Sequence, residues 1–379
     1  MGIDDSAILQ SITSPQLTAI ARQSLQRDSF QIQDWHISQL GGGVGNPVSV
    51  GLYRFAGVGQ DHQGSANWSV VLKIVQSPAN VGWVDMGDGD DQTHWNYWRR
   101  ELLLYQSGLL ETLPEGMAAP RCYGVAELPG NFALLWLEDV SDSYGNAWPL
   151  ERYALTARHL GRLNGMYLSE HAAPTFPWFS RQRSRQWLTI IPPPQTVPWE
   201  HPLVLVRYPR PEVNTFRQML LEHEQFLSRL DLLPKTVCHG DTYPTNFMSR
   251  YLVDGQEQTV ALDWALTGIE PLGDDLGQLV FGAHTNLPDA RREDVTEMLF
   301  EQYTAGLRDS GCHVDSQLVR FGFATTAALR VGLFQVYLLS EELKQYDGRV
   351  DDGRDRMITP DCFEVTMANE AYRLLESIW

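Results

Sequence analysis

The chain has 379 residues, enough for one large core or for two lobes with a cleft between them. Hydrophobic residues make up 43% and aromatic residues 11% of the sequence, and this composition indicates a folded globular protein and excludes a disordered one. The formal net charge of −18, from 29 basic and 47 acidic residues, argues against nucleic acid and against an anionic membrane surface as partners.

Cysteine usage and hydropathy bear on the compartment of the protein. The four cysteines lie far apart and form neither a CxxC pair nor the ligand spacing of a zinc site, which is typical of a reducing compartment. The N-terminus carries no apolar signal core, and the most apolar late stretch, residues 321–340, is interrupted by Arg330. We interpret that stretch as a buried helix and not as a membrane span, and we expect a cytoplasmic protein.

Up to about residue 138, short β-like runs alternate with one strong helix. The helix is predicted near 93–109, where large apolar residues recur at three- and four-residue steps and several aspartates stand just before it. The strands are predicted from apolar and β-branched runs at 35–40, 47–56, 68–76 and 132–137.

After residue 140 the chain is mostly helical. The predicted helices lie at 150–168, 211–231, 288–309, 315–345 and 361–378. A proline-rich loop around 192–202 and a β-rich stretch at 235–264 interrupt them. This order predicts an α+β fold with a small β-rich lobe over residues 1–138 and a larger helical lobe over residues 139–379. Ligands are expected in a cleft between the lobes.

The strongest motif has the pattern HGDxxxxN and is the run His239-Gly240-Asp241-Thr242-Tyr243-Pro244-Thr245-Asn246. At average residue usage such a match arises about once per thousand chains of this length. In phosphoryl transfer, one carboxylate orients the acceptor hydroxyl, and an amide oxygen a few residues later holds a metal ion on the phosphates. Asp241 suits the first role and Asn246 the second. His239 is expected to brace the loop by hydrogen bonding.

An aspartate at the end of a predicted strand follows this motif. Asp263 ends the apolar run 259–262, seventeen residues after Asn246. Taken alone, such an aspartate is more often a turn or cap residue. Its position after the first motif favours the interpretation that Asp263 binds Mg²⁺, because hard cations prefer oxygen ligands.

A lysine and a glutamate form the third candidate pair. Lys73 lies in the middle of an apolar β-like run, where a charge is costly unless it is paired. Glu101 is the only glutamate among the first 110 residues and lies on or beside the apolar face of the predicted helix. Paired with Glu101, Lys73 would lie against the phosphates of a nucleotide. The alternative is an edge-strand lysine with a solvated glutamate, and the insertion at 78–93 lengthens the path between the two side chains.

A glycine-rich segment joins the first two predicted strands. It reads Gly41-Gly42-Gly43-Val44-Gly45-Asn46, and Gly42, Gly43 and Gly45 are the candidates for close backbone approach to phosphates. No Lys-Ser/Thr follows as in a Walker loop, and no helix is predicted after it as in a dinucleotide site. A plain glycine-rich hairpin is the alternative.

Taken in order, these motifs resemble those of the aminoglycoside phosphotransferase and choline kinase-like family, whose bilobal fold is similar to that of protein kinases. The resemblance spans roughly residues 35–285. It implies that His239 to Asn246 form the catalytic loop and that Asp263-Trp264 form the metal-binding segment. Asp275 looks like the structural cap of the following helix. Protein kinases match less well, because they have HRD for HGD and DFG for Asp-Trp, and carry an Ala-Pro-Glu motif that is absent here.

The same resemblance places residues 135–140 at the hinge between the lobes. The backbone of Trp136, Leu137 and Glu138 would then hydrogen-bond the adenine. Acidic residues within 347–361 could bind a cationic acceptor, although arginines among them make a solvated surface the alternative.

The function implied is a small-molecule kinase that uses ATP (or GTP) and Mg²⁺. Asp241 would orient the acceptor hydroxyl and accept its proton, Asn246 and Asp263 would hold Mg²⁺, and Lys73 with Glu101 would contact the phosphates. The favoured acceptor is an aminoglycoside-type antibiotic or a related amino sugar. Choline-like amino alcohols, macrolides and sugars are alternatives, as is a catalytically silent nucleotide-binding module. The oligomeric state stays open.

Overall fold

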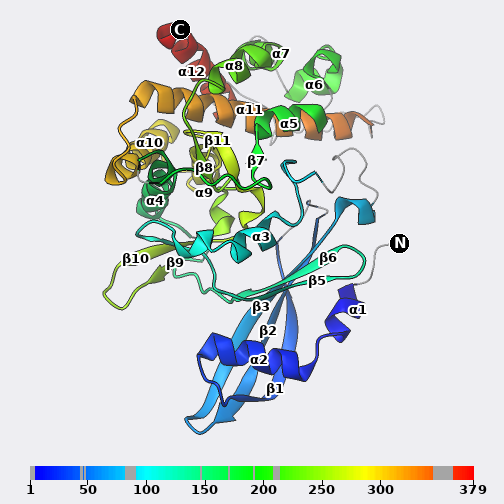
Figure 1. Ribbon diagram of the computed structural model, residues 1–379. Coiled ribbons are helices and arrows are strands. Elements are labelled where there is room, and N and C mark those ends of the chain that lie inside the picture. Colours follow the sequence, from blue (N-terminus) through cyan, green and yellow to red (C-terminus); the bar gives the residue numbers. More distant parts are fainter. Residues whose placement is uncertain are drawn as a thin grey trace. The chain divides into compact units, whose positions relative to one another are not determined.

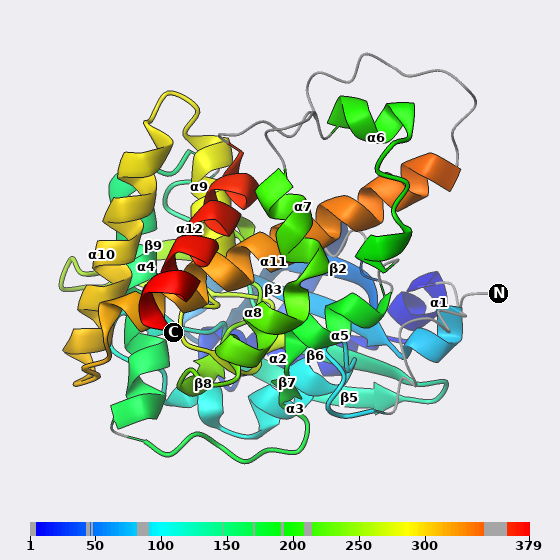
Figure 2. The same ribbon diagram turned by 90° about the horizontal axis from the view of Figure 1, so that it is seen from above.

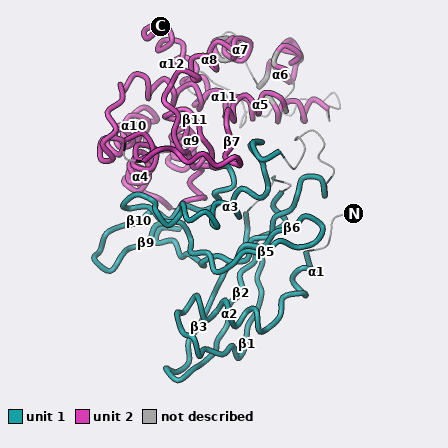
Figure 3. Tube along the Cα trace, in the orientation of Figure 1, with its two compact units in different colours: residues 1–145, 248–266 teal, residues 146–247, 267–379 magenta. Residues whose placement is uncertain are grey.

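A computed structural model describes residues 5–42, 46, 48–81, 91–145, 147–169, 171–190, 193–207, 214–344 and 362–379 (Figure 1). The chain divides into two compact units (Figure 3). Unit 1 comprises residues 1–145 and 248–266, and unit 2 comprises residues 146–247 and 267–379. Unit 1 carries a five-stranded sheet and unit 2 is mostly helical, so the predicted α+β class is confirmed.

Unit 1 is built on an antiparallel sheet. In sheet order its strands are β1 (Gln31–Leu40), β2 (Ser49–Asp61), β3 (Gly64–Gln76), β6 (Phe132–Glu138) and β5 (Cys122–Leu128). β2 buries alternate side chains along much of its length, as expected when one face of a sheet is covered. The four strands predicted for this region are confirmed, and β5 is an additional strand.

Two helices that the sequence does not predict precede the sheet. These are α1 (Asp5–Gln10) and α2 (Ser14–Leu25). α2 begins at a capping box, in which the backbone N–H of Thr13 donates to Gln16 Oε1 at 2.9 Å. It buries only three side chains, Leu17, Ile20 and Ala21, against the sheet. So few buried residues leave an apolar pattern too short to stand out in the sequence.

The helix that carries Glu101 is shorter than predicted. α3 covers Arg100–Gln106, so the prediction of 93–109 was wrong at both ends. Before it, the N–H groups of Tyr97 and Arg100 donate to carbonyls three residues back, which forms turns. The Arg100 guanidinium also binds the Trp95 carbonyl at 2.7 Å, so that this carbonyl is already engaged by a side chain. Residues 82–90, with most of the aspartates before the predicted helix, lie outside the described residues.

Short elements complete unit 1. A second sheet has the order β4 (Met117–Ala118), β10 (Glu257–Ala261) and β9 (Phe247–Tyr251). The 3₁₀ helices are η1 (Pro78–Val81), η3 (Leu109–Glu111) and η6 (Trp264–Leu266).

Unit 2 is a group of helices around three short strands, ordered β7 (Ser180–Arg181), β11 (Gly268–Pro271) and β8 (Lys235–Cys238). The helices are α4 (Leu150–Ser169), α5 (Arg183–Ile190), α6 (Pro202–Arg207), α7 (Asn214–Leu221), α8 (His223–Leu230), α9 (Leu276–Asn286), α10 (Arg292–Asp309), α11 (Ser316–Lys344) and α12 (Phe363–Ile378), with 3₁₀ turns η4 (Pro194–Thr196) and η5 (Pro244–Asn246). The helix predicted at 211–231 forms two helices, α7 and α8. The short helices α5 and α6 are additional.

α11 is the long apolar helix of unit 2. Among the described residues it is the one helix whose length and composition would allow it to cross a membrane, but 71% of its most apolar 18-residue window is buried. It packs against α9 and α12 (Figure 2). Such burial is typical of a core helix in a soluble protein, which agrees with the interpretation of residues 321–340 as a buried helix.

Two glycines allow α4 and α10 to lie in close contact. A Cβ atom added at Gly161 would lie 2.0 Å from the carbonyl oxygen of Tyr303. One added at Gly306 would lie 1.9 Å from the carbonyl oxygen of Arg158. Both distances are far below van der Waals contact, so any side chain at either position would force the helices apart.

We therefore expect Gly306→Ala to lower the free energy of unfolding by about 1–3 kcal/mol, the usual cost of overpacking. Alanine by itself would favour the helix by about 1 kcal/mol, so a net loss reports the helix contact. Urea unfolding of both proteins measures the difference. Gly124→Ala is the control, because a Cβ there meets nothing within 4 Å. A Gly306→Ala protein as stable as the wild type would contradict this account of the packing.

Candidate active site

In unit 1, one lysine ammonium lies between two carboxylates. Lys73 is in the central strand β3 and is 5% exposed. Its Nζ atom lies 2.5 Å from Glu101 Oε2 and 2.7 Å from Asp263 Oδ1. Glu101 belongs to the first turn of α3 and is 2% exposed. The ion pair expected between Lys73 and Glu101 is therefore present, with Asp263 as a second partner of the same ammonium.

Burial and charge act in opposite directions on this group. Burial alone would lower the pKa of Lys73, but the neighbouring Asp263 and Glu101 outweigh it and raise that pKa. The pKa of Glu101 is also raised, but here burial is the main cause. The charge of Asp263 adds to the increase, and the charge of Lys73 opposes it. One ammonium thus serves two carboxylates, and the group as a whole carries an excess of negative charge.

Asp263 adopts a backbone conformation that side-chain-bearing residues seldom use. Its φ of 53° lies in the left-handed region, where aspartate is tolerated better than most residues. The next residue, Trp264, is 1% exposed, donates its ring N–H to the carbonyl of Ala261 at 2.8 Å, and donates its backbone N–H to Glu101 Oε1 at 3.2 Å. These bonds hold the turn, while the Asp263 side chain remains 36% exposed.

Arg100 supports the same turn and was not singled out in the sequence. Its buried guanidinium donates to the carbonyl of Ala265 at 2.9 Å, and to carbonyls of the segment before α3. From the sequence, an arginine in the polar first turn of a helix is expected to be exposed to solvent. The local pattern does not indicate that carbonyls from distant residues bind it.

In unit 2, Asp241 and Asn246 lie together on the loop after β8. Asn246 Nδ2 donates to Asp241 Oδ2 and to the Asp241 carbonyl, each at 3.0 Å. His239 is fully buried, and its Nδ1 accepts the backbone N–H of Asp241 at 3.2 Å. The predicted bracing of the loop by His239 is thus present. The Asp241 side chain is 28% exposed and so remains accessible.

Asp275 supports this loop in a way that corrects the sequence interpretation. It occupies the N-cap position of α9, but its side chain makes no cap hydrogen bond to that helix. The carboxylate instead accepts the backbone N–H groups of His239 and Gly240, both at 2.9 Å, and the Asn164 side-chain amide at 3.0 Å. The expectation of a structural cap was therefore wrong: Asp275 stabilises the loop after β8 across 35 residues of sequence.

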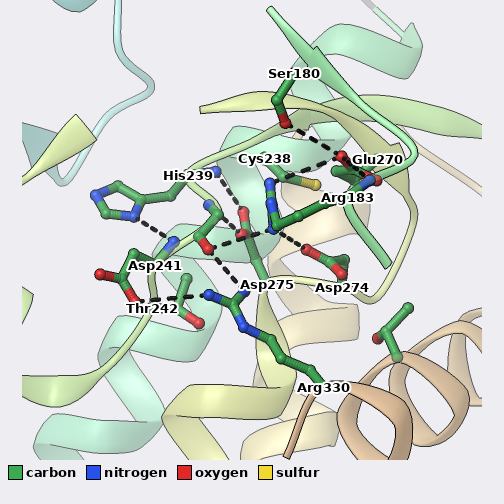
Figure 4. A network of polar contacts seen from close by, with 12 residues as sticks. Ser180, Arg183, Cys238, His239, Asp241, Thr242, Glu270, Asp274, Asp275 and Arg330 are labelled. Atoms are coloured by element: carbon green, nitrogen blue, oxygen red, sulfur yellow. Dashed lines mark hydrogen bonds and ion pairs between the residues drawn. The ribbon is translucent and has the colours of Figure 1, made fainter. Parts of the chain in front are cut away.

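A buried charged network lies behind the loop (Figure 4). Arg183 of α5 lies 2.9 Å from Asp274 and is 3% exposed. The Arg183 backbone N–H donates to Glu270 at 3.1 Å. Burial raises the pKa of Glu270 to about 7, against the charge of Arg183, and the nearby Asp274 adds to the increase. Glu270 is thus a carboxyl that the native state holds partly protonated near neutral pH.

The predicted glycine loop and hinge are described in part. Gly43 and Gly45 lie outside the described residues, as does the acidic stretch 347–361. Gly42 has φ 135°, a value that other residues rarely adopt. Trp136, Leu137 and Glu138 form the end of β6, and the N–H of Glu138 donates to the carbonyl of Arg121 at 2.8 Å.

The site residues thus form two groups, one in each unit. Lys73, Glu101 and Asp263 lie together in unit 1, and Asp241 and Asn246 lie together in unit 2. Each group by itself offers an oxygen donor of the kind that hard cations prefer. In unit 1 this is the Asp263 carboxylate, and in unit 2 it is the amide oxygen of Asn246, whose amide nitrogen is engaged by Asp241.

One protein-family model matches about half of the chain. Residues 125–311, which include the loop of residues 239–246 and Asp263, match the model of the phosphotransferase enzyme family (APH). The resemblance seen in the sequence is thereby confirmed. The match identifies a phosphotransferase.

Three solved structures are similar in fold. An amicoumacin kinase, hAmiN, in complex with AMP-PNP, Ca²⁺ and amicoumacin is 15% identical, with a TM-score of 0.46 over 90% of this chain and 88% of that one. The choline kinase LicA of Streptococcus pneumoniae is 14% identical, with a TM-score of 0.42 over 94% and 98%. An aminoglycoside phosphotransferase of Alicyclobacillus acidocaldarius is 14% identical, with a TM-score of 0.45 over 91% of each chain. No curated protein matches the sequence.

The buried carboxyl of Glu270 predicts a pH dependence of stability. Its native pKa of about 7 is above the unfolded value, so its contribution is complete below the unfolded pKa and is lost as the pH rises through about 7. We expect the wild type to lose stability on the order of 1–3 kcal/mol between about pH 5 and pH 8, as the Glu270 carboxyl ionises. In Glu270→Gln this pH-dependent loss should be absent. Glutamine keeps an acceptor for the Arg183 N–H.

Thermal unfolding at the two pH values measures this effect as the difference between wild type and variant. Glu301→Gln, at an exposed position of α10, is the matched control and should retain the wild-type pH dependence. If Glu270→Gln also retains it, then Glu270 does not titrate in this window.

Proposed function

We propose that the protein transfers the γ-phosphoryl group of ATP (or GTP) to a hydroxyl of a small acceptor, with an aminoglycoside-type antibiotic or related amino sugar as the first candidate. The observation that carries this proposal is the catalytic loop. Asp241 presents an accessible carboxylate, its neighbour Asn246 is bonded to the same carboxylate, and Asp275 holds the loop backbone from behind. A rigid carboxylate of this kind can align a hydroxyl for attack.

Asp241 has the role of orienting base. The acceptor hydroxyl donates to its carboxylate, the acceptor oxygen forms a bond to the γ-phosphorus, and the bond from that phosphorus to the bridging oxygen breaks. The proton of the hydroxyl passes to Asp241, and the nucleoside diphosphate leaves. The transition state of such transfers is loose, so alignment contributes more than base strength.

Lys73 supplies positive charge to the nucleotide phosphates. Its position is set by Glu101, which is itself held by the Trp264 N–H. Asp263 and Asn246 would bind Mg²⁺ through oxygen atoms, and the ion would offset the negative charge of the phosphates. The backbones of Gly42, Gly43 and Gly45 would contact the phosphates, and those of residues 136–138 the adenine.

In this proposal residues 1–138 bind the nucleotide and residues 139–379 supply the catalytic loop and the acceptor site. The net charge of −18 favours a cationic acceptor by long-range attraction, and this supports an amino sugar. The same charge would suit a choline-like amino alcohol. Macrolides and neutral sugars would need apolar or hydrogen-bonding contacts instead.

The test is a mass-spectrometric screen for an added phosphoryl group. The protein is incubated with MgATP or MgGTP and a panel of aminoglycosides, spectinomycin, amicoumacin, choline-like amino alcohols, macrolides and sugars. A phosphorylated product made by the wild type names the acceptor class. Nucleotide binding without any product would favour the silent nucleotide-binding module. Absence of nucleotide binding would contradict the proposal.

We expect Asp241→Asn to lower the rate of transfer by at least about a hundredfold, because a neutral amide aligns the acceptor hydroxyl less well than a carboxylate and cannot accept its proton. Nucleotide affinity, measured by calorimetry, should change little. Asp289→Asn, at an exposed position after α9, is the matched control and should transfer at the wild-type rate. Retained transfer in Asp241→Asn would show that another group orients the acceptor.

A further inference from the structure

Besides Arg183, which pairs with Asp274, unit 2 has an arginine that lies beside the Asp241 carboxylate. Arg330 comes from α11, where it interrupts the apolar stretch noted in the sequence. Its Nη1 donates to the carbonyl of Gly240 at 2.7 Å, and its Nη2 lies 3.7 Å from Asp241 Oδ1 (Figure 4). Neither the family match nor the motifs assign a role to this residue.

The charge of Arg330 is compensated only in part, by the charges of Asp241, Asp274 and Asp275. Its side chain is 13% exposed, and its buried Nε has no hydrogen-bond partner within the described part of the chain. Burial and the neighbouring Arg183 lower the pKa of Arg330, so its charged form is held at a cost. Arginine nonetheless stays protonated in proteins. A partly desolvated guanidinium of this kind attracts any negative charge that forms next to it.

The other carboxylates of the network are already engaged. Asp275 accepts the backbone of the catalytic loop, and Asp274 is paired with Arg183. Among the residues that the structure describes, Asp241 is the carboxylate that lies within ion-pair distance of Arg330. The two oxygens of Asp241 are also distinct, because Oδ2 accepts from Asn246 and Oδ1 faces Arg330.

The distance between Arg330 and Asp241 would allow one oxygen atom to bond to both side chains. At 3.7 Å, Nη2 and Oδ1 are too far apart for a direct hydrogen bond. An oxygen placed about 2.8 Å from each atom would bond to both. We propose that this position receives the acceptor hydroxyl, and that Arg330 is a catalytic residue which donates to the acceptor oxygen while the hydroxyl donates to Asp241 Oδ1. This inference rests on the proposed phosphoryl transfer.

The role of Arg330 in the reaction is electrostatic. As the acceptor oxygen bonds to the γ-phosphorus and the bond to the bridging oxygen breaks, the proton of the hydroxyl passes to Asp241 Oδ1. The guanidinium gains and loses no proton. It stabilises the negative charge shared by the acceptor oxygen and the transferred group, in the way that preorganised donors act at other sites.

The surroundings of Arg330 hold it in place for this task. Nη1 is anchored on the Gly240 carbonyl, and the guanidinium lies over the Trp187 ring at 5.5 Å. The two Nη atoms therefore divide their functions, one binding the loop and the other facing Asp241. A lysine has one nitrogen atom at its tip and cannot reproduce this division, so it is expected to replace arginine only in part.

The experiment compares Arg330→Ala and Arg330→Lys with the wild type, using the acceptor that the panel screen identifies. We expect Arg330→Ala to lower kcat by about a hundredfold, in the range seen when a transition-state donor is removed. The affinity for MgATP, measured by calorimetry, should change less than about threefold, because the partner of Arg330 is the acceptor oxygen. Arg330→Lys should keep part of the activity, and added guanidinium ion should restore part of it to Arg330→Ala.

Arg320→Ala is the matched control. This arginine lies on the same helix, pairs with Glu370 and lies over the Phe300 ring at 4.6 Å, but these partners are not part of the catalytic loop. Its loss should reduce thermal stability and leave kcat unchanged. It therefore measures what a structural arginine of α11 contributes.

Two results would overturn the inference. One is a kcat of Arg330→Ala within about threefold of the wild type. The other is a loss that guanidinium does not restore and that Arg320→Ala shows in equal measure, since a purely structural role would act in this way. A wild type that phosphorylates no acceptor would instead remove the proposed function, and the role of Arg330 with it.

Discussion

The loop of residues 239–246 in unit 2, which carries Asp241, depends on one buried carboxylate. Asp275 accepts two consecutive backbone N–H groups, those of His239 and Gly240, which would otherwise be left unpaired in the interior. An unpaired buried donor costs about 1–3 kcal/mol, so this carboxylate specifies one conformation of the loop. The loop in turn sets the direction of the Asp241 carboxylate. Its carbonyl at Gly240 binds the guanidinium of Arg330, which links α11 to the same centre.

In unit 1 the site residues are also fixed by a buried group that needs partners. Here the partners are charged side chains and not backbone N–H groups. Lys73 is buried in the centre of a sheet, and its ammonium is tolerated because Glu101 and Asp263 lie within 2.7 Å. Removing one partner of such a group leaves an uncompensated buried charge, which is more costly than never having placed it there. The positions of α3 and of the turn after β10 are therefore coupled through a single nitrogen atom, and Trp264 strengthens this coupling through its bond to Glu101.

Much of the fold was predictable because its elements are long and periodic. The strands β2 and β3 and helices such as α10 bury side chains at regular spacing along much of their length, which leaves a clear pattern. The errors fall where a local pattern is overridden by distant contacts. Arg100 binds carbonyls before α3 and shortens the helix that the apolar spacing predicts. α2 buries too few residues to give a helical pattern in the sequence. Asp275 was interpreted as a cap because it directly precedes α9.

The sequence by itself determined the chemical groups and their order: a strand lysine, a helix glutamate, the HGDxxxxN loop and a strand-ending aspartate. These could be read because phosphoryl transfer needs particular atoms at short, fixed spacings along the chain. Only the tertiary structure showed that Asp275 holds the loop, that Arg100 supports the turn of Asp263, and that Arg330 lies beside Asp241. Such contacts join residues 35 to 165 positions apart, and the folding of the chain alone brings them together.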